Sequence, residues 1–247
     1  MKEENKSNSV LTPKISIRCK KEWGEMAKAS KIFNDWMTRL DSRFNVCEVI
    51  ITNVDFKFTP SVENVLFIRL RVKTTTWDRG EIVELRGGTV AMLVNLENED
   101  TGEIFTVLVK QARIATGNFE LVEIPAGMID GGAFLGVAAR EIEEELDLRF
   151  EKSELTDITG VDANGDTGIY LSPGLLDESC RFYLAERRMT DMEIKNLQGK
   201  TCGLADESEI ITLKLVRFED IPKATHDAKT LVAWALYQIH KAKSATG

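Results

Sequence analysis

The chain has 247 residues, of which 43% are hydrophobic and 29% charged, so it supports a folded core of one or two domains and excludes global disorder. Its formal net charge of −8 disfavours non-specific binding to nucleic acid, and we expect no such partner. The cysteines form no Cys-x-x-Cys pair, which favours reduced thiols in a cytoplasmic protein over a zinc site or disulfides. No apolar run reaches about 18 residues, which predicts no membrane contact through a spanning helix.

The first 86 residues are predicted to hold a polar tail, one helix and a small sheet. Residues 1–14 are polar and lack periodicity, as in a flexible tail. From about residue 21 to residue 41, apolar positions recur at three- and four-residue steps, which predicts an amphipathic helix. Three stretches rich in Val, Ile, Phe and Thr follow, at 49–54, 65–72 and 81–85, separated by turn residues. We expect them to pair as antiparallel strands, so that residues 15–86 form an N-terminal subdomain.

A second domain is predicted to span residues 87–247, beginning at Gly87-Gly88. Its elements alternate between strands and helices, with strands at Thr89–Leu96 and Ile104–Gln111, a helix at Phe134–Leu146, strands near 155–162, 180–187 and 209–218, and a final helix at about 226–243. Strands mixed with helices on both flanks predict an α/β domain in which a mixed sheet lies between helices.

One segment, residues 123–148, carries side chains typical of a metal site; its sequence is EIPAGMIDGGAFLGVAAREIEEELDL. Helix positions i, i+3 and i+4 share a face, so Glu141, Glu144 and Glu145 project together. Three converging carboxylates repel one another, and a divalent cation with a preference for hard oxygen ligands, such as Mg²⁺, would relieve the repulsion. A solvated acidic face is the alternative for an isolated run of glutamates, and the glycine-rich passage before the helix argues against it.

This segment resembles the signature of the Nudix family, which reads glycine, five residues, glutamate, seven residues, then Arg-Glu-apolar-x-Glu-Glu-x-Gly-apolar. Gly127 begins the motif and residues 140–148 match its dense half. Two positions depart from it: Ala133 replaces the early glutamate, with the spacer to Arg140 one residue short, and Asp147 replaces the late glycine. All the helical carboxylates remain, so we interpret Ala133 as a change in the loop and not as a loss of activity. The resemblance implies an α/β/α sandwich with a mixed sheet, preceded by a small antiparallel sheet with a leading helix.

Other segments resemble the ADP-ribose and ADP-sugar diphosphatases of that family, in particular the plant-type enzymes. They are Val109–Arg113 followed by Glu123–Gly127, Leu171–Gly174 with Glu178, and Gly203–Glu209. The likeness covers roughly residues 20–240. It implies hydrolysis of a nucleotide sugar such as ADP-ribose or ADP-glucose with Mg²⁺, or Mn²⁺ in its place, by a homodimer that its N-terminal sheet helps to build.

The resemblance also implies which residues hold the metal and which activate water. Glu141 and Glu145 would bind the metal directly, and Glu144 would bind or orient its water. The Ala126 carbonyl and Glu209 would complete the site. Glu207 would be the general base that takes a proton from the attacking water. A loop in which the last two glutamates are only solvated is the alternative.

Substrate contacts are assigned by the same resemblance. Arg113 would bind the diphosphate, for which the planar fork of a guanidinium is suited. The remaining residues implied to contact substrate are Ser172, Pro173, Gly174 and Glu178. Arg140 and Gly127 would have structural roles. For Ser172–Gly174 an ordinary turn is an equal alternative, and Trp77, near a turn, is the one tryptophan placed where it can stack on a base.

Two other functions stay open at this point. One is a related diphosphatase for UDP-glucose or GDP-mannose, which differs only in how the base is recognised. The other is a Nudix-fold module that senses a nucleotide without hydrolysing it. A pure binder has no need of three carboxylates that repel one another, so the cluster favours an enzyme.

Overall fold

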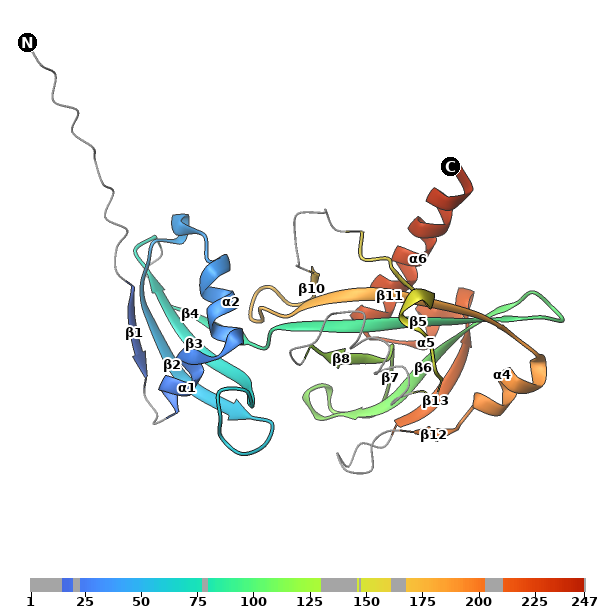
Figure 1. Cartoon of the computed structure of the whole chain (residues 1–247), viewed down its shortest axis with the longest axis horizontal. Coiled ribbons are helices and arrows are strands. Elements are labelled where there is room, and N and C mark those ends of the chain that lie inside the picture. The colour runs from blue at the N-terminus through green and yellow to red at the C-terminus, as the bar shows by residue number, and fades with distance from the viewer. Residues whose placement is uncertain are drawn as a thin grey trace, which may run out of the picture. The chain divides into compact units, whose positions relative to one another are not determined.

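The computed structural model describes residues 15–19, 23–76, 80–129, 146, 148–160, 168–202 and 211–246. The chain divides into two compact units, each with its own sheet and hydrophobic core (Figure 1). The first comprises Met1–Arg86 together with Ser172–Asp177, and the second comprises Gly87–Leu171 together with Glu178–Gly247. Within the described ranges, no helix has the length and apolar character needed to cross a membrane.

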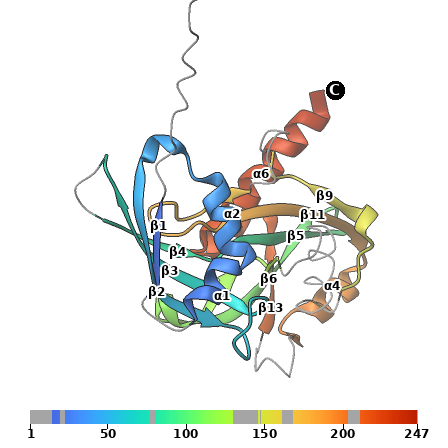
Figure 2. The ribbon, with the colours of Figure 1, turned by 60° about the vertical axis from the view of Figure 1, so that its left-hand side comes forward.

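The first unit is a four-stranded sheet with two short helices on one face (Figures 1 and 2). Its strands follow the order β1 (Ser16–Cys19), β2 (Val46–Phe56), β3 (Val65–Thr74) and β4 (Glu81–Leu85). The three predicted strands are confirmed and pair antiparallel. The prediction that this sheet is wholly antiparallel is wrong in one respect: the edge strand β1, which was not predicted, runs parallel to β2. With only four residues, β1 is too short to show a period in the sequence.

The prediction of one continuous helix over residues 21–41 is wrong, because the structure has two shorter helices there. The structure has α1 (Gly24–Ala29) and α2 (Lys31–Arg39), separated by Ser30 in an extended conformation with ψ of 151°. The buried Ser30 hydroxyl donates to the Ala27 carbonyl over 2.7 Å and accepts from the Phe33 amide over 3.4 Å. Serine thus ends one helix and caps the next, as its short polar side chain allows.

The second unit is built on a nine-stranded mixed sheet among the described residues, with the central order β10-β11-β5-β6-β13-β12. Its strands are β5 (Gly88–Asn98), β6 (Ile104–Arg113), β7 (Asn118–Glu123), β8 (Ala126–Met128), β9 (Leu155–Asp157), β10 (Ile169–Tyr170), β11 (Ser179–Met189), β12 (Thr201–Cys202) and β13 (Ile211–Arg217). The helices in the described part of this unit are α4 (Asp191–Leu197), α5 (Ile221–Ala224) and α6 (Ala228–Thr246). Short 3₁₀ turns lie at Ser42–Phe44 in the first unit, and at Ile114–Thr116, Lys152–Glu154 and Phe218–Asp220 in the second.

Most predicted elements of this unit are confirmed, and the differences are local. Within the described residues, the strand expected near 155–162 is only the three-residue β9. The elements that were not predicted are α4, α5, β7, β8, β10 and β12. β5 pairs in parallel with β11 along all 11 residues, although about 90 residues separate them in the chain. The expected α/β class with a mixed sheet is therefore confirmed.

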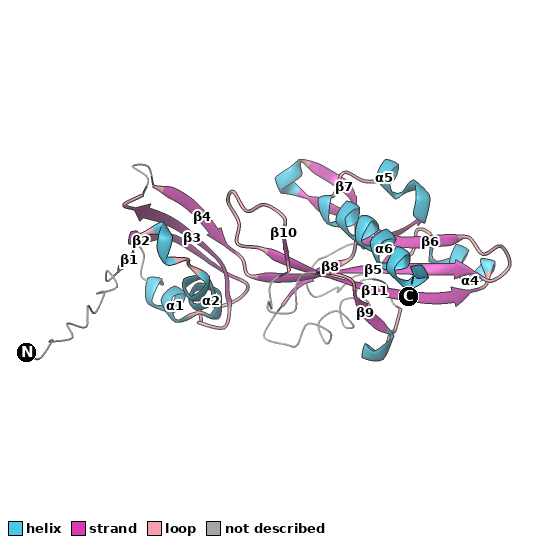
Figure 3. Cartoon of the chain, turned by 90° about the horizontal axis from the view of Figure 1, so that it is seen from above, coloured by secondary structure: helices cyan, strands magenta, loops and turns pink. Residues whose placement is uncertain are grey.

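The central strands are apolar on both faces, which is why they read as nearly continuous hydrophobic runs. Along β5, Val90 and Met92 pack with Leu146 on one face, here called the Leu146 face. Ala91 and Leu93 pack on the opposite face, here called the α6 face, with Ala233 and Tyr237 as members of the same core. Figure 3 shows α6 lying across β5 and β11.

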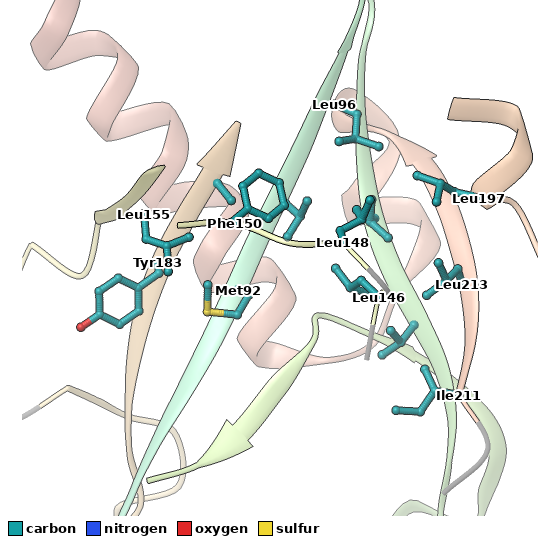
Figure 4. Packing of buried hydrophobic residues seen from close by; sticks show 14 of the residues in the cluster. Met92, Leu96, Leu146, Leu148, Phe150, Leu155, Tyr183, Leu197, Ile211 and Leu213 are labelled. Atoms are coloured by element: carbon teal, nitrogen blue, oxygen red, sulfur yellow. The ribbon is translucent and has the colours of Figure 1, made fainter. Parts of the chain in front are cut away.

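Leu146 is the last residue of the helix predicted at Phe134–Leu146, and the rest of that helix lies outside the described residues. It is helical and fully buried on the Leu146 face. Leu148 and Phe150 follow it into the same core, beside Met92, Leu155 and the other residues labelled in Figure 4. The segment that follows the expected metal-binding helix is therefore anchored by its apolar side chains.

Candidate active site

The described part of the candidate site is organised around Glu123, the last residue of β7. Its side chain is only 2% exposed, and it accepts hydrogen bonds from two cations. The Arg113 Nε atom lies 2.6 Å from Oε1, and the Lys229 Nζ atom lies 3.2 Å from Oε2. A buried carboxylate requires such partners, because losing water without them costs several kcal/mol.

Strand register places this ion pair on the Leu146 face. Glu123 is the direct partner of Val109 in β6, and Val109 packs in the core that contains Leu146. Directly paired residues share a face, and so do residues two apart along a strand. Arg113 follows Val109 by two such steps, beyond a register shift that follows Gln111. Glu123 therefore lies on the Leu146 face, and its ion pair with Arg113 brings the guanidinium to it there.

The segment after Glu123 is fixed by hydrogen bonds to two elements, α6 and β5. The Ile124 amide donates to the Thr230 hydroxyl over 2.7 Å, and the Pro125 carbonyl accepts from the Met92 amide over 2.9 Å. β8 then pairs with β5, with Ala126 opposite Ala91 and Gly127 opposite Val90. The predicted carbonyl ligand at Ala126 thus belongs to a backbone whose position is fixed by hydrogen bonds.

The start of α6 supplies the other half of this polar cluster. Asp227 caps the helix, because its Oδ2 atom accepts from the Thr230 amide over 2.9 Å and from the Thr230 hydroxyl over 2.7 Å. Its Oδ1 atom lies 3.0 Å from Lys229 Nζ. Burial opposes ionisation of both residues, but their mutual attraction and hydrogen bonds outweigh it. The pKa of Asp227 therefore lies below its ordinary value and the pKa of Lys229 above its own, and both are charged at neutral pH.

Glu178 lies near this cluster within the second unit. Its side chain is buried and accepts from the Thr89 hydroxyl over 3.1 Å. The neighbouring Cys180 thiol has its pKa raised to about 12, chiefly by burial, with further effects from the charges of Glu178, Lys229 and Asp227. Cys180 is therefore an unreactive thiol. Because the charges of Glu178, Lys229 and Asp227 all act on it, these three residues lie in its neighbourhood.

Ser172, Pro173 and Gly174 lie in the first unit and not with Glu178 in the second. The amides of Leu175 and Leu176 both donate to the Ser172 carbonyl, over 3.1 and 2.9 Å, which makes the segment a turn. The Leu175 carbonyl accepts from Glu84 of β4 over 2.8 Å. The domain expected at 87–247 is thus interrupted here, and the role of this turn in binding substrate stays a prediction.

The predicted catalytic residues Glu144 and Glu207 lie outside the described residues. The same holds for the predicted metal ligands Glu141, Glu145 and Glu209, for Arg140 with its structural role, and for Ala133, Asp147 and Trp77. Among the residues that are described, no group of three His, Cys, Asp or Glu side chains is placed to hold a metal ion.

Sequence reasoning missed the cluster at the start of α6. Asp227 precedes a helical apolar pattern and is a recognisable N-cap signal. Lys229 gave no signal, because a lysine in the first turn of an amphipathic helix is ordinarily exposed. Only the approach of α6 to β7 reveals that its ammonium group is buried against Glu123.

The chain is similar to several known proteins. A family model described as the NUDIX domain matches residues 87–235. The chain is 32% identical over 225 residues to Nudix hydrolase 14, chloroplastic, of Arabidopsis thaliana, covering 85% of this chain and 71% of that protein. It is 33% identical over 171 residues to the ADP-ribose pyrophosphatase of Bacillus subtilis (strain 168), covering 67% of this chain and 79% of that one. Among solved structures, the C. elegans Ap4A hydrolase binary complex aligns with a TM-score of 0.41 and 20% identity, covering 64% of this chain and 99% of that one.

Proposed function

The chain belongs to the Nudix family, and we propose that it hydrolyses the diphosphate of ADP-sugars such as ADP-ribose and ADP-glucose to AMP and a sugar phosphate. The geometry of Arg113 carries the proposal. Glu123 holds the guanidinium through Nε, while the side chain is 40% exposed and its two Nη atoms have no partner within the described ranges. Two parallel N–H donors on a fixed fork match the paired oxygens of a diphosphate. The name of the B. subtilis relative supports the substrate class.

The proposed metal is Mg²⁺, for which Mn²⁺ is an alternative. Carboxylates and a backbone carbonyl are the hard oxygen ligands that both ions prefer. Glu141, Glu145, Glu209 and the Ala126 carbonyl would hold it, and Glu144 would orient a water. When bound, the metal would neutralise the diphosphate and acidify water. Glu207 would accept the proton of the attacking water.

A panel of nucleotide sugars tests this function. With Mg²⁺ present, we expect ADP-ribose or ADP-glucose to be hydrolysed with a kcat/KM about tenfold or more above those of UDP-glucose and GDP-mannose, with AMP as product. Addition of EDTA should abolish turnover. A preference for UDP-glucose or GDP-mannose would contradict the ADP assignment. Binding of the nucleotide sugars without any turnover would instead support the sensing module.

We further propose a homodimer whose interface uses the sheet of the first unit. Ile50, Arg71 and Ile82 are register partners across β2, β3 and β4. They lie on the face opposite the helices, because Leu70, the neighbour of Arg71, is fully buried in the helix-covered core. Ile82 is 48% exposed, and such a row of apolar side chains around one cation can meet its own copy across a two-fold axis.

Light scattering at micromolar concentration should give the mass of a dimer for the wild type. Ile82→Asp should lower that mass to a monomer, because it buries a charge in the interface. Phe119→Asp is the matched control: Phe119 is 84% exposed in the second unit, and its substitution should leave the mass unchanged. A wild-type monomer would exclude the dimer, and a dimeric Ile82→Asp variant would exclude this interface.

The predicted cytoplasmic location is retained as part of the proposal. No disulfide joins Cys19, Cys47, Cys180 and Cys202. Free thiols fit a reducing compartment. The Arabidopsis relative is named as chloroplastic, which makes an organelle the alternative to test by localisation of the tagged full chain.

A further inference from the structure

We propose that Lys229 is a positioning residue that orients Arg113 through the carboxylate of Glu123. The inference rests on the proposed role of Arg113 in binding a diphosphate and deepens it. Lys229 lies in the first turn of α6, outside the predicted site. In this proposal it sets the orientation in which the Arg113 guanidinium meets the substrate.

The two oxygens of Glu123 have different partners, and this division is the first step. Oε1 accepts from Arg113 Nε over 2.6 Å, and Oε2 accepts from Lys229 Nζ over 3.2 Å. Because Lys229 occupies one oxygen, Arg113 meets the other through Nε alone, and among the described residues its Nη1 and Nη2 atoms have no partner. A carboxylate without this lysine would instead tend to take the guanidinium by both oxygens in the bidentate fork that arginine favours. That pairing would consume an Nη donor which the diphosphate needs.

Lys229 is itself held in place, which is the second step. Its Nζ atom lies between Glu123 and Asp227, and its side chain is 19% exposed. Asp227 is fixed in turn, because its Oδ2 atom caps α6 by accepting hydrogen bonds from the amide and the hydroxyl of Thr230. Thr230 is fully buried and accepts from the Ile124 amide beside Glu123. The polar contacts therefore close a ring between β7 and α6.

The charges along this path alternate in sign, which is the third step. Arg113, Glu123, Lys229 and Asp227 are cation, anion, cation and anion, each within 3.2 Å of the next. Ions in this order stabilise one another, and each of the two buried carboxylates has a cationic partner. Such a network has one low-energy arrangement, so the orientation of Arg113 follows from that of Lys229.

A double-mutant cycle tests the coupling. The probe is the α,β-methylene analogue of ADP-ribose, which cannot be hydrolysed at the bridging position, and its Kd is measured by calorimetry on the full chain with Mg²⁺. Lys229→Met should raise Kd about tenfold or more. In the Arg113→Ala background the same change should alter Kd by less than about twofold, because Lys229 acts only through Arg113. Lys229→Arg keeps the charge and should restore Kd to within about threefold of the wild type.

Lys241→Met is the matched control, because Lys241 lies on the same helix in an exposed ion pair with Glu186 at 2.9 Å. It should change Kd by less than about twofold. Thermal melts identify any variant that fails to fold, and Lys229→Gln, which keeps an uncharged donor one bond closer to the backbone, then replaces the methionine variant in the cycle. Equal factors for Lys229→Met in both backgrounds would show a merely structural role and overturn the proposal.

The cycle is repeated with inorganic pyrophosphate, which carries the diphosphate without nucleoside or sugar. Coupling with pyrophosphate in a protein that hydrolyses no ADP-sugar would refute the proposed function and leave the positioning role supported. Turnover of ADP-ribose with additive effects on both probes would do the reverse. Failure of the wild type to bind either probe would overturn both, since Arg113 would then not bind phosphate.

Discussion

Replacing Glu145 with glutamine is expected to lower the turnover of ADP-ribose by about 100-fold or more and to leave the protein folded. The change removes one charged ligand from the proposed metal site while conserving the size of the side chain. The substitution should lower kcat, because the metal stabilises the negative charge that develops on the diphosphate in the transition state. The melting temperature should not fall, since one of three mutually repelling carboxylates is neutralised. Initial rates at saturating Mg²⁺ and circular dichroism melts measure the two effects.

Glu143→Gln provides the matched control for this prediction. Glu143 belongs to the same run of glutamates but is not at the i, i+3 and i+4 spacing that unites Glu141, Glu144 and Glu145. Its substitution removes the same charge from the expected helix and should change kcat by less than about threefold. Near wild-type kcat for Glu145→Gln at saturating Mg²⁺ would refute the metal assignment. Equal losses in both variants would point to the net charge of the segment instead of a ligand.

The second large effect is expected for stability, at Glu123. Glu123→Gln should lower the free energy of unfolding of the second unit by about 3 kcal/mol, the lower end of what removal of one member of a buried ion pair costs. The lower end applies because Lys229 retains Asp227 as its partner. For a unit of this size the melting temperature should fall by about 6–12 °C. Denaturant and thermal unfolding followed by fluorescence provide the measurement.

Glu120→Gln tests whether the loss comes from burial. Glu120 lies on the same strand and pairs with Lys110 at 3.6 Å, but its side chain is 69% exposed. A solvent-screened pair of this kind contributes about 0–1 kcal/mol, so this variant should unfold close to the wild type. If Glu123→Gln is no less stable than Glu120→Gln, the buried network contributes no net stability, and the carboxylate of Glu123 serves orientation only.

Local chemistry in the sequence predicted the elements whose residues show a clear hydrophobic run or period. The apolar run Val90–Leu96 gave a strand, and the periodic positions between Leu231 and Ile239 gave the final helix. The residues of the Nudix signature predicted the family, which the match over residues 87–235 confirms. Local reasoning failed at Ser30, where the helical period continues through a residue whose hydroxyl competes for backbone hydrogen bonds.

The sequence by itself therefore determined the strand-and-helix pattern, the fold class and the family, because each is encoded in spacing along a short stretch of chain. Only the tertiary structure decided that β5 lies parallel to β11, that Ser172–Gly174 belongs to the first unit, and that Lys229 reaches Glu123. These features join residues about 90 to 110 positions apart, and their energies depend on burial and on partners that no local pattern reveals. The sequence does not distinguish a buried lysine from an exposed one. Lys229 becomes buried only because the first turn of α6 packs against the end of β7.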